Sequence, residues 1–209
     1  MPTDVLVAKW VPFFKAIDAE LKVPVELHCL GGFAIASKFG LPRATGDVDF
    51  VEVGGAEAID LLAIAGRGTA LAKKHKLYLD FVTVGVYPEA YAQRLEELAL
   101  DGLERLRIKV FEKHDIVLAK LSRAADHDRE DVKYLASTAG LDGAVLRERF
   151  EKEVKFQCTN ETRDQNTLDF WIEMIEEIQG AKPTRPSPAV SSSPPAGQAV
   201  ESARRRIRS

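Results

Sequence analysis

Two aspartates separated by a single residue stand in a segment that alternates polar and apolar side chains, Asp47-Val-Asp-Phe-Val-Glu-Val53. A period of two predicts a β-strand over 47–53, with the two aspartates on one face and Val48 and Phe50 on the other. Two carboxylates side by side repel each other and lose hydration when a fold encloses them, which a divalent cation between them reverses. Carboxylate oxygens are ligands that Mg²⁺ and Mn²⁺ accept. The strand therefore predicts a metal site.

A pair of glycines, Gly31 and Gly32, precedes this strand, at the junction of a predicted strand over 25–30 and a predicted helix over 33–39. The helix is indicated by apolar residues on one side, namely Phe33, Ile35, Ala36 and Phe39. Gly40 suits its C-terminal cap. Bare backbone amides at the positive end of a helix dipole suit a phosphate group. Together with the carboxylate pair they indicate a site for a metal-bound nucleotide.

Each feature alone has an ordinary explanation, because Asp-x-Asp occurs on surface strands and Gly-Gly in common turns. Their order, with Arg43 and Thr45 between them, is more specific. The run Gly31-Gly-Phe-Ala-Ile-Ala…Leu41-Pro-Arg-Ala-Thr-Gly-Asp-Val-Asp-Phe50 resembles the signature of the polymerase-beta-like nucleotidyltransferases. It is most similar to the minimal nucleotidyltransferases of bacterial genomes, which include relatives of abortive-infection toxins and of antitoxins. The resemblance covers roughly residues 25–140.

The resemblance implies an α+β protein with the nucleotidyltransferase fold: a mixed β-sheet flanked by helices, a C-terminal helical subdomain and a disordered tail. It implies transfer of a nucleoside monophosphate from a nucleoside triphosphate to a hydroxyl acceptor, with Mg²⁺ or Mn²⁺ as cofactor. Asp47 and Asp49 would be catalytic metal ligands, and a third carboxylate is expected on the neighbouring strand. Asp80, in a strand predicted over 77–84, occupies that position. Without the resemblance, a solvated acid on an edge strand is the better explanation of Asp80.

Two basic side chains are candidates for contacts to the triphosphate. Arg43 and Lys120 would add charge-assisted hydrogen bonds, while Gly31 and Gly32 would cradle phosphates and Thr45 would complete the nucleotide-binding set. Lys120 follows a predicted helix that Asp115 is expected to cap.

A later segment, Asp128-Arg-Glu-Asp131, places two acids one helical turn apart. The spacing is explained by an acidic helix start that complements the dipole. The resemblance offers another explanation, a helical part that closes over the nucleotide.

The composition fits one globular domain with an appendage, since 45% of the 209 residues are hydrophobic and 29% are charged. We expect an α/β core over 1–112, a helical subdomain over 113–180, and a disordered, basic, Pro- and Ser-rich tail over 181–209. No membrane span or secretory signal is recognisable. Cys29 and Cys158 match no metal or redox spacing, and the four histidines match no zinc pattern. These features predict a cytoplasmic protein.

The net charge of −3 is unevenly distributed. Six basic residues and one acid after residue 180 give the tail +5, so residues 1–180 carry −8. An acidic body argues against a broad grip on nucleic acid, which depends on neutralising phosphates. The basic end of the tail, 204–208, either contacts nucleic acid or keeps the chain soluble.

The remaining periodicity predicts helices over 5–21 and 56–74, the second weakened by Gly66 and Gly68 and so divisible into two pieces. It also predicts a helix over 87–106 with Arg94, Glu96 and Glu97 on its exposed side. A strand over 106–111 and helices over 141–156 and 167–178 follow.

The sequence leaves the acceptor open between RNA, a protein hydroxyl and a small molecule, and it does not reveal the base preference. A cognate antitoxin or toxin is a possible partner that the resemblance implies. Two other functions stay open as well: a non-catalytic nucleotide-binding or antitoxin-like module, and a phosphotransferase that uses the same metal site.

Overall fold

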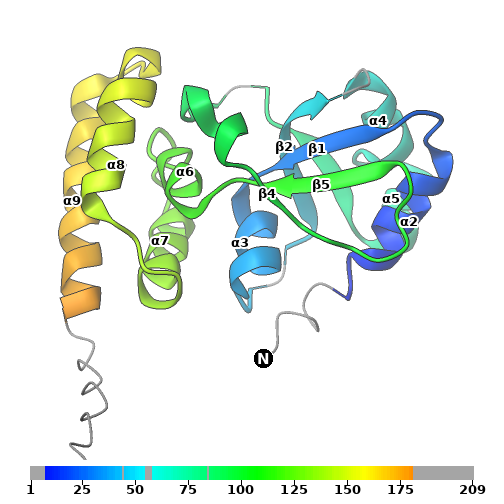
Figure 1. The fold of residues 1–209 in the computed structure, drawn as a ribbon, viewed down its shortest axis with the longest axis horizontal. Helices are drawn as coiled ribbons and strands as arrows, with labels where there is room; N and C mark the ends of the chain where they lie inside the picture. Colours follow the sequence, from blue (N-terminus) through cyan, green and yellow to red (C-terminus); the bar gives the residue numbers. More distant parts are fainter. Residues whose placement is uncertain (1–7, 44, 55–57, 84, 181–209) are drawn as a thin grey trace, which may run out of the picture.

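The computed structural model describes residues 8–43, 45–54, 58–83 and 85–180, so the predicted tail lies outside the described residues. A five-stranded mixed sheet runs in the order β3-β2-β1-β5-β4 (Figure 1). The strands are β1 Val25–Cys29, β2 Asp47–Gly54, β3 Tyr78–Phe81, β4 Glu96–Glu97 and β5 Leu106–Val110. β1 pairs with β5 and β2 with β3 in parallel, while β1–β2 and β4–β5 are antiparallel. The α+β class and the mixed sheet are confirmed.

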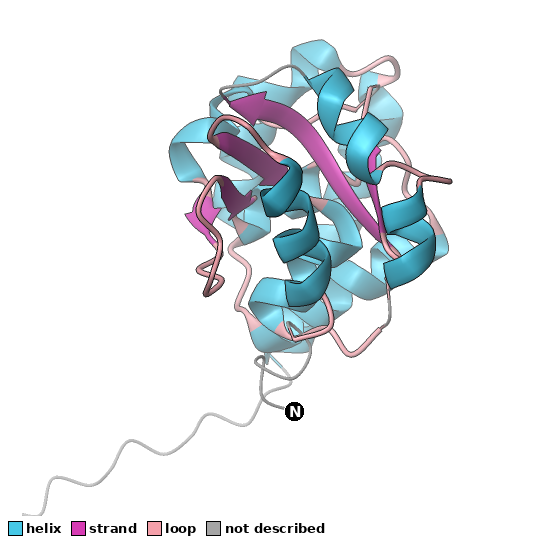
Figure 2. Cartoon of the chain, turned by 90° about the vertical axis from the view of Figure 1, so that its right-hand side faces the viewer, coloured by secondary structure: helices cyan, strands magenta, loops and turns pink. Residues whose placement is uncertain are grey.

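Helices surround the sheet, and Figure 2 shows them both in front of the strands and behind them. In chain order they are α2 Val11–Glu20, α3 Gly31–Phe39, α4 Ala58–Ala65, α5 Ala70–His75, α6 Lys113–Leu118, α7 Asp126–Thr138, α8 Gly143–Arg149 and α9 Glu161–Gly180. Shorter helical turns are η1 Glu89–Arg94, η2 Phe150–Val154 and η3 Lys155–Gln157. None of the helices in the described ranges is long and apolar enough to cross a bilayer.

One face of the sheet is apolar and carries the core. Its fully enclosed side chains alternate along the strands, as the period of two predicts: Leu27, Cys29, Val48, Phe50, Leu79, Ile108 and Val110. α2 and α3 belong to this core, because Phe33 meets Trp10 and Phe14 through edge-on ring contacts. Cys29 packs in this core as a small hydrophobe, and its burial raises the pKa of its thiol.

The opposite face of the sheet is polar. The strand register places Asp47, Asp49 and Asp80 there, since Asp49 pairs with Asp80 and Asp47 with Tyr78. The alternation read from 47–53 is therefore confirmed, and it separates the acids from the core by one layer of backbone.

The C-terminal helices form a layer beside the sheet. In Figure 1, α8 and α9 lie side by side at the left edge, and α6 and α7 lie between them and the strands. α7 packs against both α3 and α9, so it joins the glycine-rich helix to the outer layer.

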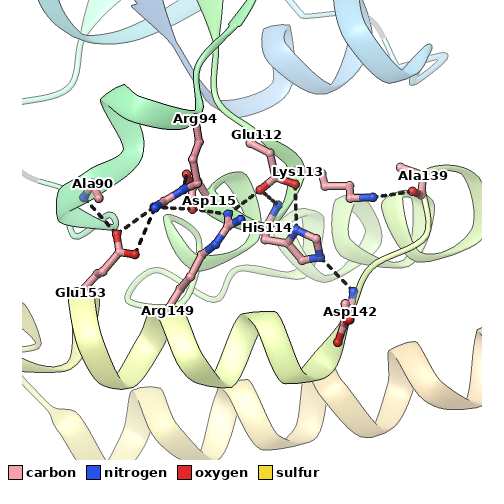
Figure 3. A network of polar contacts seen from close by, with 10 residues as sticks. All are labelled: Ala90, Arg94, Glu112, Lys113, His114, Asp115, Ala139, Asp142, Arg149 and Glu153. Carbon is pink, nitrogen blue, oxygen red and sulfur yellow. Dashed lines mark hydrogen bonds and ion pairs between the residues drawn. The ribbon is translucent and has the colours of Figure 1, made fainter.

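An ionic network ties this layer to the segment before β4 (Figure 3). Arg94 donates to Asp115 at 2.9 Å and to Glu153 at 2.8 Å. Arg149 donates to Asp115 at 2.7 Å and also contacts Glu112. A carboxylate that is enclosed like Asp115 needs such partners, because an unpaired buried charge is costly.

Two local predictions are wrong. The helix predicted over 87–106 is replaced by the turn η1, the two-residue β4 and irregular chain. Arg94 is drawn inward by Asp115 and Glu153, so the helical charge pairing read from Arg94, Glu96 and Glu97 does not form. Asp115 is not a cap either, because Glu112 caps α6 by accepting the His114 N–H at 3.0 Å.

Other expectations are confirmed. The segment 56–74 is divided, with α4 ending at Ala65 and α5 beginning at Ala70. Gly40 has φ 75° and caps α3 in the left-handed conformation. Helical structure covers 143–157 and 161–180, close to the predicted ranges.

Candidate metal centre

Three carboxylates meet on the polar face of the sheet. Asp47 and Asp49 come from β2 and Asp80 from the adjacent β3, and their oxygen atoms lie within 4.8 Å of one another. The parallel pairing of β2 with β3 places Asp80 directly beside Asp49. The structure thus brings together the three acids that the sequence singled out.

The surroundings of Asp49 disfavour the charged form of its carboxyl group. Burial, followed by the charges of Asp47 and Asp80, raises the pKa of its carboxyl to about 6, against the opposing effect of Arg123 and Lys120. Among the described residues no basic side chain forms an ion pair with Asp49. A divalent cation would remove this repulsion, and three carboxylates are the hard donor set that Mg²⁺ or Mn²⁺ takes. The residues therefore fit the metal that the resemblance implies.

Gly31 brings the start of α3 against this cluster. The Leu30 N–H donates to the Asp49 carbonyl at 3.0 Å, so the chain entering α3 is fixed to β2. Gly31 has φ 70°, and a β-carbon there would lie 2.1 Å from Oδ2 of Asp49. Only glycine permits both this backbone conformation and this close approach.

The other predicted nucleotide-binding residues gather around Gly32. A β-carbon at Gly32 would lie 3.5 Å from Nη2 of Arg43 and 3.7 Å from Oγ1 of Thr45, which are ordinary contacts. The Thr45 hydroxyl donates to the Asp47 side chain and to its carbonyl at 3.2 Å. Thr45 therefore links the glycine pair to Asp47, the first of the three acids.

Lys120 lies in a buried ion-pair network instead of projecting into solvent. Its Nζ donates to Asp128 at 2.9 Å and to Asp131 at 3.0 Å. Arg43 donates to both oxygens of Asp131 at 2.8 Å, and Arg123 to Asp128 at 2.6 Å. Two carboxylates thus hold three basic side chains close to the three acids.

The acids at the start of α7 have the helix-start role considered from the sequence, and they also belong to the ion-pair network. Asp128 accepts the Ala125 N–H at 3.1 Å, which is the helix-start role. It also holds Lys120 and Arg123, and Asp131 holds Lys120 and Arg43. α7 therefore positions charge next to the acids.

A cavity of about 140 Å³ opens at Asp49. Its lining combines Gly31 and the charged residues Asp49, Lys120 and Arg123 with the more apolar Val82, Val86, Tyr87, Ile116 and Ala119. The sequence interpretation missed Tyr87 because it assigned 87–106 to a helix, whereas the structure has only the short turn η1 there.

Comparisons with known proteins show which family the chain matches. Residues 14–179 match the family described as "Nucleotidyltransferase of unknown function (DUF6036)". No curated protein matches the sequence. The crystal structure of JHP933 from Helicobacter pylori is similar at a TM-score of 0.34 and 14% identity, over 85% of this chain and 93% of that one. A similarity at that level is too weak to show a shared fold or function. The family match covers most of the chain, and the protein therefore belongs to this family of nucleotidyltransferases.

Proposed function

We propose that this protein is a metal-dependent nucleotidyltransferase that moves a nucleoside monophosphate from a nucleoside triphosphate to a hydroxyl acceptor. The observation that carries the proposal is the group of Asp47, Asp49 and Asp80, whose oxygens lie within 4.8 Å of one another beside Gly31. Like charges at this spacing destabilise the protein when no cation is bound, and a bound cation would offset their repulsion.

The metal would be held by these three carboxylates. Mg²⁺ or Mn²⁺, when bound there, supplies neutralisation of phosphate charge and lowers the pKa of a coordinated hydroxyl. The three ligands come from two hydrogen-bonded strands, so the sheet fixes their relative positions before any substrate arrives.

The chain's own groups would bind and orient the triphosphate. The amides at the start of α3 face phosphate oxygens without side-chain obstruction at Gly31 and Gly32. Arg43, held by Asp131, and the cavity-lining Arg123 and Lys120 add positive charge. Such positioning and electrostatic stabilisation supply most of the catalysis in phosphoryl transfer.

The reaction balances without any further co-reactant. The acceptor oxygen forms a bond to the α-phosphorus, the bond from that phosphorus to the bridging oxygen breaks, and pyrophosphate leaves. The proton of the acceptor hydroxyl passes to a base, and Asp80 is the most exposed of the three acids and the best placed to pass it on to water. A cognate toxin or antitoxin partner and a cytoplasmic location stay predictions.

The proposal is tested by following two labels. The full chain is incubated with Mg²⁺, a cell lysate as acceptor source, and triphosphate labelled at the α- or the γ-phosphorus. We expect the α-label to enter an acceptor and pyrophosphate to be released, with loss of at least about a hundredfold in Asp47→Asn and Asp49→Asn. Asp101→Asn, at an exposed turn, is the matched control that keeps full activity.

Three outcomes would reject the proposal. Movement of the γ-label alone would make the protein a phosphotransferase. Nucleotide binding with no pyrophosphate release would make it a binding module. Activity that survives in both aspartate variants would remove the three carboxylates from the chemistry.

A further inference from the structure

A second and larger cavity, of about 630 Å³, lies between the start of α7 and the first half of α9. Its volume falls in the range of small-molecule sites. The side chains that matter are Arg129, Arg163, Asn166, Phe170 and Trp171. Nothing in the proposed transfer of the nucleotide uses these residues.

An aromatic ring is offered to solvent in this cavity. Phe170 is 53% exposed, one of a few large apolar side chains left open among the described residues, whereas the adjacent Trp171 is 2% exposed. The exposed ring of Phe170 is a surface on which a planar base can stack. The cavity therefore favours a ligand that contains a flat ring.

Two arginines line the same cavity. Arg163 is fixed in place, because it donates to Asp164 at 2.8 Å and to the Ser122 carbonyl at 2.9 Å. Arg129 has a distant contact, at 3.8 Å, to Asp126, the one acid among the lining residues. Asp164 compensates the charge of Arg163, whereas Arg129 is about half exposed and loosely paired, so its donors favour an anion such as a phosphate.

The charge pattern limits the size of the ligand. The surface continues into a neighbouring hollow that shares Phe170 and Arg129 and adds Glu173, Glu177 and Lys133, and this lysine is already paired with Glu130. A phosphate backbone that continued in this direction would meet negative charge. With residues 1–180 carrying −8 in total, the site suits a single phosphorylated unit better than a polynucleotide.

The location of this cavity relates it to the metal centre. Ser122 and Arg123 line the smaller cavity that contains Asp49, and the next two residues, Ala124 and Ala125, line the larger one. The hydrogen bond from Arg163 to the Ser122 carbonyl joins the two walls. One short segment therefore separates the two cavities.

We propose that the larger cavity binds a free mononucleotide, with its base on Phe170 and its phosphate at Arg129 and Arg163. This binding does not rest on the proposed function, and it requires no metal at the three carboxylates.

Binding is measured by calorimetry on the full chain in EDTA, with adenosine monophosphate as the probe. We expect a single binding event that Asp49→Asn leaves unchanged. Phe170→Ala and Arg129→Gln should each weaken it at least about tenfold. Phe156→Ala, which removes another ring that is 62% exposed outside the cavity, is the matched control and should leave the affinity unchanged.

Further probes distinguish binding of the whole monophosphate from binding of its nucleoside or its phosphate alone, and from binding of an oligonucleotide. Adenosine and inorganic phosphate should each bind more weakly than the monophosphate, and an eight-residue oligoribonucleotide should bind no more tightly than the monophosphate. Absence of monophosphate binding, an unchanged affinity in Phe170→Ala, or tighter binding of the oligonucleotide would each overturn the inference. If transfer fails while the Phe170-dependent binding persists, the proposed function is wrong and the binding site stands.

Discussion

A β-carbon on Gly31 would lie 2.1 Å from Oδ2 of Asp49, although eighteen positions separate the two residues in the chain. The glycine turn and the acidic strand therefore form one structural unit. The left-handed φ of Gly31 orients the start of α3, and the missing side chain lets the carboxylate approach it.

Gly31→Ala should lower the free energy of unfolding by about 3 kcal/mol, because alanine is strained at this φ and collides with Asp49. Gly32→Ala is the matched control, expected to change it by less than about 1 kcal/mol, since its contacts stay at 3.5 Å or more. Denaturant unfolding measures both. In the double variant Gly31→Ala/Asp49→Ala we expect part of the loss to be recovered, and strictly additive losses would refute the close approach.

Lys120→Met should destabilise the protein by about 3 kcal/mol, because Asp128 and Asp131 lose a shared buried cation and retain only one arginine each. The control is Lys133→Met. It removes a partly exposed lysine that pairs with Glu130 of the same helix, α7, and we expect it to change the stability little. Thermal and denaturant unfolding of the two variants give the comparison. Equal stabilities would mean that the network contributes nothing to folding.

Asp131→Asn should raise the KM for nucleoside triphosphate with a smaller change in kcat, since Asp131 is buried and holds Arg43 through two contacts of 2.8 Å. We expect an increase of roughly fivefold to tenfold, as for a weakened charge-assisted contact. Initial rates over a range of triphosphate concentrations separate the two constants. A loss confined to kcat would place Asp131 in the chemistry.

Glu112 should make stability depend on pH. Burial opposes its charge, but hydrogen bonds from His114 and Arg149 outweigh burial and lower its pKa to about 2. Because the pKa in the folded state is below the unfolded value near 4.5, the stabilisation is complete above pH 4.5 and is lost as the pH falls toward 2.

Glu112→Gln should therefore cost about 1–2 kcal/mol at pH 7, after allowance for partial exposure. Unfolding curves at pH 7, 5 and 3 should show the gap between variant and parent shrinking at the lowest pH. The exposed Glu148→Gln controls for a general effect of charge and should show no such trend. A gap that is constant with pH would contradict the ionic role of Glu112.

The sequence alone predicted the acidic strand and the face on which its aspartates lie, because a period of two places side chains on faces independently of the rest of the fold. Asp47 and Asp49 needed only that rule. The glycine turn, the cap at Gly40 and the division between α4 and α5 followed from the backbone preferences of glycine, which are equally local.

Features that depend on residues far apart in the chain were not predictable in this way. Arg94 resembled a helical surface arginine, and only the folded chain places it between Asp115 and Glu153. The cavity on α7 and α9 joins residues 124–129 with 160–171, and no spacing in the sequence indicates that these segments meet. The third carboxylate, Asp80, was only partly predictable. Its place beside Asp49 depends on how β2 and β3 pair, and that pairing could be expected only once the fold class was assumed.

The central claim, that Asp47, Asp49 and Asp80 form a cation site, is tested most directly by the melting temperatures of the parent and Asp49→Asn with and without Mn²⁺. In EDTA the variant should melt higher by several degrees, because it removes one of three mutually repelling charges. Mn²⁺ at millimolar concentration should stabilise the parent and leave the variant almost unchanged. Equal responses of the two proteins to Mn²⁺, or none from the parent, would contradict the account.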